Sequence, residues 1–171
     1  MQNVVYASGH LWGGLNTVIS DGANLNTGIA YFDVKPSVSG GVLSASVQGQ
    51  GYISLKGNSV IYPGIGVTAN GTAAAAFTVS GNSYFPSAAY AHLTPAGSQA
   101  VNIVAAGGAA HDDFSGYPYF GGNGTARWGD YSWGVADGNS IWLATEYIPG
   151  NINSVDFLTN FGTYVYKVTL Q

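Results

Sequence analysis

Three segments of the chain repeat one pattern, in which a strand, a tight turn and a second strand follow one another. They span residues 3–17, 61–81 and 131–148, and their turns are Ser8-Gly9, Asn70-Gly71 and Asp137-Gly138. Asn-Gly and Asp-Gly are strong hairpin signals because both turn residues must tolerate positive φ. A repeat constrains the fold more than any other feature of this chain, because each copy is expected to form the same supersecondary unit.

Short segments rich in β-branched and aromatic residues, each closed by Gly, Asn, Asp or Pro, predict strands along the whole chain. They cover residues 3–7, 10–19, 28–34, 41–55, 60–69, 72–79, 87–93, 99–106, 131–136, 140–148 and 162–170. No window has helical periodicity. The alanine run at residues 73–76 lies between two turns and leads into Phe77, so we expect a strand there that packs closely against another surface. The chain is therefore predicted to be all-β.

The repeat divides this single predicted domain into units of approximately residues 1–57, 58–110 and 111–171. Each unit is predicted to be an antiparallel meander of about four strands, although the last lacks an evident fourth strand. Such a meander is close in plan to a β-propeller blade, and closed propellers have roughly 4–8 blades. Three blades therefore predict either part of a larger propeller or a ring completed by oligomerisation. A β-sandwich is the alternative, because two packed sheets also hold many short strands.

Three segments carry a resemblance to a known family. They are Tyr62-Pro63-Gly64-Ile65-Gly66, residues 77–93, and residues 126–150 with the element Arg127-Trp128-Gly129-Asp130-Tyr131. Over most of its length the chain resembles the C-terminal blades of uncharacterised secreted bacterial β-propeller proteins. The resemblance implies a propeller-like fold and an extracellular location, with the export signal outside this chain. It implies no reaction, because propellers host lectins, hydrolases and scaffolds alike.

The composition argues against several classes of function. Only 7% of the residues are charged, and the four bases, Lys35, Lys56, Arg127 and Lys167, are scattered. Nucleic-acid binding needs clustered cations and is not expected. The chain has no cysteine, which excludes thiolate catalysis and thiolate metal sites. No apolar run approaches the ~18 residues of a membrane-spanning helix.

Polar and aromatic residues concentrate between residues 111 and 131, which include the only arginine and three of the eight acidic residues. This segment predicts a binding site for a glycan or a protein surface, and the residues expected to contact the ligand are Tyr117, Tyr119, Arg127, Trp128 and Tyr131. Asp112 and Asp113 are candidate calcium ligands, although their spacing matches no known loop motif; no other cofactor is expected. The alternative is structural, with an ion pair between Arg127 and Asp130 fixing the junction between blades above a buried Trp128.

Catalysis by paired carboxylates is the competing hypothesis. Glu146, the only glutamate, lies on a predicted strand whose alternation places it on the same face as Trp142. An apolar setting raises the pKa of a carboxyl group, as a general acid requires. With Asp113 and Asp130 it could supply the carboxylate pair that glycoside hydrolysis needs.

No catalytic triad, nucleophile elbow or phosphate-binding loop is evident in the sequence. His10 and His92 are isolated on predicted strands and are expected to be hydrogen-bonded structural residues rather than ligands. The sequence therefore favours an extracellular, non-catalytic module that recognises a glycan or a protein surface, or that assembles through exposed blade edges. Its expected partners are further copies of itself or the remaining blades of a larger propeller. A secreted glycan hydrolase is the alternative.

Overall fold

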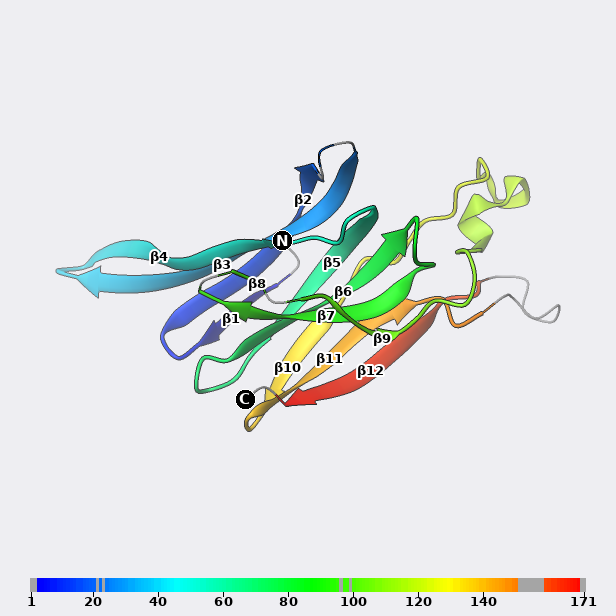
Figure 1. Cartoon of the computed structure of the whole chain (residues 1–171). Helices are drawn as coiled ribbons and strands as arrows, with labels where there is room; N and C mark the ends of the chain where they lie inside the picture. The colour runs from blue at the N-terminus through cyan, green and yellow to red at the C-terminus, as the bar shows by residue number, and fades with distance from the viewer. Residues whose placement is uncertain are drawn as a thin grey trace.

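The computed structural model describes residues 3–20, 22, 24–95, 97–98, 100–150 and 159–169. These residues form three antiparallel sheets, shown in Figure 1, and no α-helix. The first sheet holds β1 (Val4–Ala7), β2 (His10–Ser20), β3 (Leu25–Ser39) and β4 (Val42–Ile53). The middle sheet holds β5 (Asn58–Val67), β6 (Ala73–Gly81), β7 (Ser87–Thr94), β8 (Gly97–Ser98) and β9 (Asn102–Ala105), and the third holds β10 (Trp133–Asp137), β11 (Ser140–Tyr147) and β12 (Gly162–Thr169). The all-β prediction is confirmed.

Strands adjacent in the chain lie side by side in each sheet. The first and third sheets are meanders in the orders β1-β2-β3-β4 and β10-β11-β12, and in the middle sheet both β8 and β9 pair with β7. The third sheet has no fourth strand among the described residues. Among the described strands, the short strand β8 is the one that the sequence did not predict.

The three predicted hairpin turns differ in detail. Ser8 and Gly9 have φ values of 51° and 79°, as a two-residue turn requires. The turn after β10 lies one residue later than predicted, because Asp137 is still paired with Ser140. The loop between β5 and β6 is longer than a tight turn, because Thr68 binds both the amide and the carbonyl of Thr72 across it.

The middle sheet lies between the other two (Figure 1). Side chains of β6 alternate between its two faces, so the run from Ala73 to Val79 is buried on both sides. Ala73, Ala75 and Phe77 pack into a core shared with the first sheet. Ala74 and Ala76 pack against Ile141, Leu143 and Val168 of the third sheet. The small side chains of β6 let both neighbouring sheets approach closely, whereas the sequence predicted close packing against one other surface.

The middle and third sheets come closest where β5 passes β10. A Cβ atom on Gly64 would lie 2.4 Å from the backbone of Ser132, and one on Gly134 would lie 2.5 Å from the amide nitrogen of Gly66. A buried polar contact accompanies this approach, since the Thr78 hydroxyl donates to the Glu146 carbonyl at 2.9 Å. The junction between these sheets therefore depends on glycine as well as on apolar packing.

A tyrosine from the last strand pair of each outer unit ties that sheet to the middle sheet. The Tyr31 hydroxyl donates to the Thr94 carbonyl at 3.0 Å, and the Tyr166 hydroxyl donates to the Ala89 carbonyl at 2.9 Å. Burial raises the pKa of both phenols. Each of these hydroxyls satisfies a backbone carbonyl across a sheet interface.

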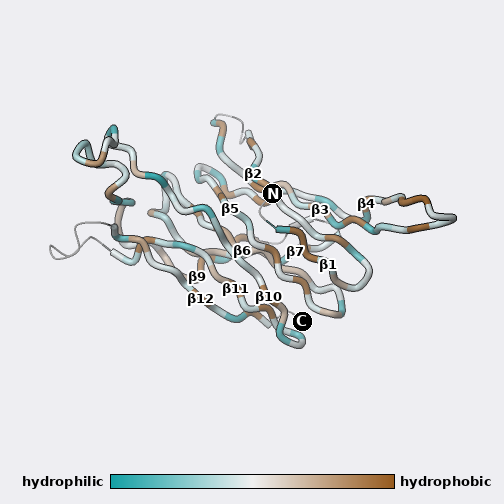
Figure 2. The backbone as a smooth tube through the Cα atoms, turned by 180° about the vertical axis from the view of Figure 1, so that it is seen from behind, coloured by the Kyte–Doolittle hydropathy of each residue, from teal (hydrophilic) through white to brown (hydrophobic). Residues whose placement is uncertain are grey.

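The hairpin of β3 and β4 continues beyond the other strands as an arm, which we define as residues 34–47 (Figure 1). The sequence predicted that β3 ends at residue 34, but pairing continues to Ser39 opposite Val42. The paired residues Val34 and Val47, Pro36 and Ala45, and Val38 and Leu43 share one face of the arm. Val38 and Leu43 are 70% and 72% exposed, and hydrophobic segments of the arm are visible in Figure 2. This apolar face is uncovered.

Candidate functional site

Most of the predicted site residues meet in a pocket of about 170 Å³ beside the third sheet. The pocket is lined by His111, Asp113, Arg127, Trp128, Gly129, Asp130, Glu146 and Phe161. They come from the segment after β9, the segment before β10, the end of β11 and the segment before β12. The pocket thus brings together Arg127, Trp128 and the three carboxylates considered for catalysis, although these are separated by up to 33 positions in the chain.

Glu146 lies on the face of β11 that points away from the middle sheet. Its neighbours Leu143 and Thr145 are buried on the opposite face, as the alternation predicted. The backbone at Gly129 covers the carboxylate so closely that a Cβ atom there would lie 1.7 Å from Oε2. Burial, together with the negative charge of Asp130, raises the pKa of Glu146. The carboxyl group therefore has the electrostatic setting of a proton donor.

Asp113 has the opposite electrostatic setting. Burial acts to raise its pKa, but hydrogen bonds from Ser115 and the nearby His111 outweigh this and hold the pKa of Asp113 below its usual value. Its Oδ1 accepts from the Ser115 amide at 2.8 Å and caps the first 3-10 turn, η1 (Phe114–Gly116). Asp113 is therefore a fixed anion that lines the same pocket as Glu146.

His111 lines the pocket together with the carboxylates and also contacts Trp128. Its Nε2 lies 2.8 Å from the Arg127 carbonyl, which can only accept, so Nε2 carries the hydrogen. Its Nδ1 is buried and has no hydrogen-bond partner in the described part of the chain. The ring meets Trp128 edge-on at a centroid distance of 4.9 Å. In the neutral ring, Nδ1 is then an unused acceptor at the pocket.

Arg127 and Asp130 form the predicted ion pair, but at the surface. Arg127 Nη2 lies 3.9 Å from Asp130 Oδ2, and the two side chains are 80% and 51% exposed. Trp128 is half-buried rather than buried. The structural alternative, in which this pair fixes the junction between blades, is therefore wrong, because an exposed pair contributes little to stability. The guanidinium is available to a ligand.

The predicted aromatic cluster lies in a separate surface loop. The loop contains η1 and a second 3-10 turn, η2 (Pro118–Phe120), and is closed by backbone hydrogen bonds such as that from the Gly124 amide to the Gly116 carbonyl at 2.9 Å. Tyr119 at its tip is 91% exposed. Its ring meets that of Phe120 at 5.1 Å. The loop therefore exposes the Tyr119 ring on a backbone that is held by hydrogen bonds.

The other predicted residues lie outside the pocket. Tyr117 hydrogen-bonds to the Asp112 carboxylate, which raises the pKa of the phenol, so both residues support the aromatic loop. Tyr131 is exposed. Among the residues that the structure describes, no group of three His, Cys, Asp or Glu side chains could hold a metal ion. The calcium hypothesis for Asp112 and Asp113 gains no support from their geometry.

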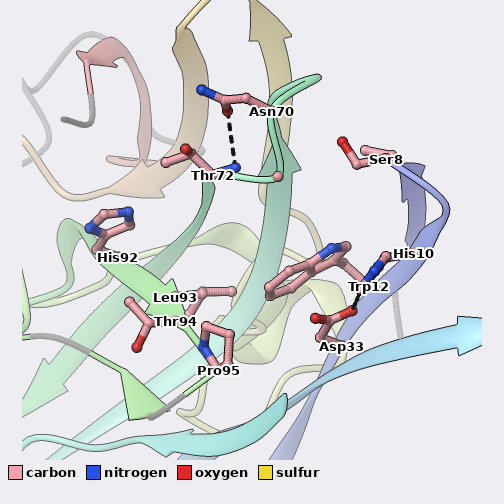
Figure 3. A pocket seen from close by; sticks show the side chains of 12 residues that line it. Ser8, His10, Trp12, Asp33, Asn70, Thr72, His92, Leu93, Thr94 and Pro95 are labelled. Carbon is pink, nitrogen blue, oxygen red and sulfur yellow. Dashed lines mark hydrogen bonds and ion pairs between the residues drawn. The ribbon is translucent and has the colours of Figure 1, made fainter. Parts of the chain in front are cut away.

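Sequence reasoning missed a second and larger pocket, of about 420 Å³, between the first and middle sheets. It contains His10, Asp33 and His92 (Figure 3). His10 Nδ1 lies 2.6 Å from Asp33 Oδ1, as expected of a hydrogen-bonded structural histidine, but the sequence did not predict that these two residues share a pocket with His92. The repeat could have predicted this pocket. Equivalent hairpin turns of stacked units lie at the same end of the stack, which brings residue 10 near residues 70–72.

Replacing Glu146 with glutamine is expected to stabilise the protein near neutral pH. Because the pKa of Glu146 is raised above 4.5 by burial, the folded state binds the proton more tightly than the unfolded state. The contribution of Glu146 to stability is then fully present below pH 4.5 and is lost as the pH rises through its raised pKa. Glu146→Gln should raise the urea midpoint near neutral pH and leave it unchanged at low pH. An equal rise at both pH values would contradict the raised pKa.

The chain matches no protein-family model, no curated protein and no solved structure. No helix within the described ranges is long and apolar enough to cross a membrane. The arguments for function therefore come from the geometry of this chain.

Proposed function

We propose that this chain is a non-catalytic assembly and binding module that acts outside the cell. Its first and third sheets pack against the third and first sheets of a second copy. The observation that supports this is the difference between the sheets: β6 of the middle sheet is buried on both faces, whereas each outer sheet leaves one apolar face uncovered.

The uncovered face of the third sheet is aromatic and aliphatic. Pairing in the sheet places Trp133 beside Ala144 and Val165, and Val135 beside Trp142 and Lys167. Trp133 and Val165 are 53% and 60% exposed. Large aromatic side chains at the centre of a sheet face are typical of residues that anchor interfaces. This face extends toward Glu146 and the pocket around it.

The uncovered face of the first sheet is aliphatic with tyrosines. Pairing places on it Val4, Tyr6, Leu11, Phe32, Val34, Val47 and Tyr52. The apolar face of the arm continues it, since Val34 and Val47 belong to both. An exposed apolar surface of this extent marks an interaction site or an aggregation hazard.

A second copy of the chain is the favoured partner for the two uncovered faces. The face on the first sheet differs from the face on the third sheet, and each needs another sheet to cover it. The middle sheet already packs between two such sheets within the chain. Two copies joined head to tail supply six sheets, which lies within the roughly 4–8 blades of closed propellers. Head-to-tail contacts that close produce a ring, and both uncovered faces are then buried. The aromatic loop with Tyr119 remains outside this contact as the surface for a glycan or protein ligand.

Charge on either face is expected to convert a two-chain assembly into monomers. A lysine introduced by Tyr6→Lys on the first sheet, or by Val165→Lys on the third, would place an ammonium in an apolar interface, which is unfavourable without a partner. Light scattering at several concentrations should give twice the mass of one chain for the unmodified protein and the mass of one chain for either variant. Phe85→Lys, at an exposed apolar residue on neither face, is the matched control and should remain a dimer.

Mixing the two variants tests the direction of assembly. Tyr6→Lys keeps an intact third sheet and Val165→Lys keeps an intact first sheet, so an equimolar mixture should recover dimers through one unmodified interface. A mixture that stays monomeric while the unmodified protein dimerises would contradict head-to-tail packing. An unmodified protein that is monomeric at every concentration would overturn the proposal. Further blades of a longer chain would then be expected to cover the two apolar faces.

A hydrolase acting on glycans is the second candidate, supported by the opposite pKa shifts of Glu146 and Asp113 in one pocket. Pairs of titratable groups whose environments separate their pKa values often divide the roles of acid and base. In this candidate Glu146 donates the proton, Asp113 acts as the anionic partner and Arg127 holds an acidic substrate group. Glu146→Gln should then abolish glycan hydrolysis while keeping the fold. Equal turnover by both proteins, or none by either, would exclude it.

A further inference from the structure

The pocket between the first and middle sheets is built from one chain and does not depend on self-association. Its walls come from the turns between β1 and β2 and between β5 and β6, and from β2, β3 and the end of β7. In Figure 3, His10 and Asp33 lie on one side of the space and His92 on the opposite side, with Trp12 between them. At about 420 Å³ it has the size of an ordinary small-molecule site.

The hydrogen bond between His10 and Asp33 fixes the imidazole. Asp33 is buried, with a side-chain exposure of 4%, whereas His10 is 26% exposed. A carboxylate only accepts, so Nδ1 of His10 donates to it and the neutral ring keeps Nε2 as an acceptor. A ring held in this way by a buried carboxylate is positioned for a partner other than the protein.

Asn70, in the turn between β5 and β6, supplies a hydrogen-bond donor to the pocket. Oδ1 of Asn70 accepts from the Thr72 amide at 3.2 Å and from the Thr68 hydroxyl. These bonds orient the side-chain amide and leave its NH₂ group as a donor. A ligand that meets both walls must therefore both donate and accept, as hydroxyl groups do.

The charge of the lining residues and the apolar part of the pocket further limit which ligands the pocket can bind. The described residues that line the pocket include no lysine or arginine, and the one carboxylate among them is already bonded to His10, so the pocket does not suit an anion. Trp12, Leu93 and Pro95 provide an apolar wall. We infer that this pocket binds a single neutral sugar residue, whose hydroxyls meet His10, Asn70 and His92 and whose C–H face packs on the apolar wall.

The test uses four methyl glycosides, those of glucose, galactose, mannose and N-acetylglucosamine, with glycerol as a hydroxylated compound that lacks a ring. Saturation-transfer NMR at millimolar concentrations should detect at least one glycoside and not glycerol. His92→Ala, at a half-buried residue, should weaken that binding about tenfold, which corresponds to losing one hydrogen bond. Asp33→Asn, which removes the charge but keeps the shape, should weaken it by at least as much.

The control is Asn139→Ala, which changes a turn asparagine that does not line the pocket and should leave binding unchanged. Because Asp33 is buried, circular dichroism must first show that Asp33→Asn is folded; if it is not, His92→Ala carries the test. Binding of none of the glycosides, equal binding of glycerol, or unchanged affinity in His92→Ala would each overturn the inference.

Discussion

Gly64→Ala is expected to destabilise the protein by about 3 kcal/mol, near the upper end of the range for overpacked positions. The added methyl group would lie 2.4 Å from the carbonyl carbon and oxygen of Ser132 and 2.5 Å from the Trp133 amide nitrogen. All three are backbone atoms, which cannot move aside as the end of a flexible side chain can. The middle and third sheets must therefore separate. Urea denaturation followed by circular dichroism measures the loss.

Gly150→Ala is the matched control, since no atom of the described residues lies within 4 Å of a Cβ atom built there. Its stability should stay the same or rise by up to about 1 kcal/mol, because alanine restricts the unfolded chain more than glycine does. If Gly64→Ala were as stable as Gly150→Ala, β5 and β10 would not approach each other as described.

Phe77→Ala is expected to cost about 4 kcal/mol, as is typical when a large aromatic side chain is removed from a core. Phe77 is fully buried between the first and middle sheets and is the largest side chain that β6 places there. Its neighbours in that face of β6 are alanines and a valine, which are too small to fill the cavity. The unfolding midpoint in urea or on heating reports the effect.

Phe85→Ala removes the same side chain from an exposed position and should change stability by less than about 0.5 kcal/mol. A small effect at Phe77 would indicate that the first sheet does not cover the middle sheet in solution. In that case the core shared by β3 and β6 would not exist.

The fold was largely predictable because its strands are local and closed by turn residues. Gly, Asn and Asp mark where each strand ends, and the alanine run at residues 73–76 indicated a strand that packs closely against another surface. The arm was not predicted, since Pro36 suggested an end to β3. Proline can continue an edge or projecting strand when its missing N–H is not needed for the ladder. The sequence also could not show that the middle sheet, rather than an outer one, is covered on both faces.

The candidate site was predictable in part. With so few charges in the chain, the clustering of acids around residues 111–130 was informative, and the pocket contains Asp113, Asp130 and Glu146. The pocket at His10 was missed because its members are separated by up to 88 positions and meet only when two sheets stack. Single side chains on strands give no local signal for such a meeting. The exposure of the Arg127 and Asp130 pair likewise depends on the path of the chain before β10.

The order of the sheets along the chain also affects how the protein forms. Every strand pairs with its neighbour in the sequence or, for β7 and β9, across one short strand, so each sheet closes only short loops and can form while synthesis continues. The face of β6 that holds Ala74 and Ala76, however, is covered by β11 and β12, which are made last. Until β11 and β12 are synthesised, the nascent chain therefore carries two stacked sheets, with one face of the middle sheet uncovered. Because alanines line that face, it exposes little apolar area to other nascent chains.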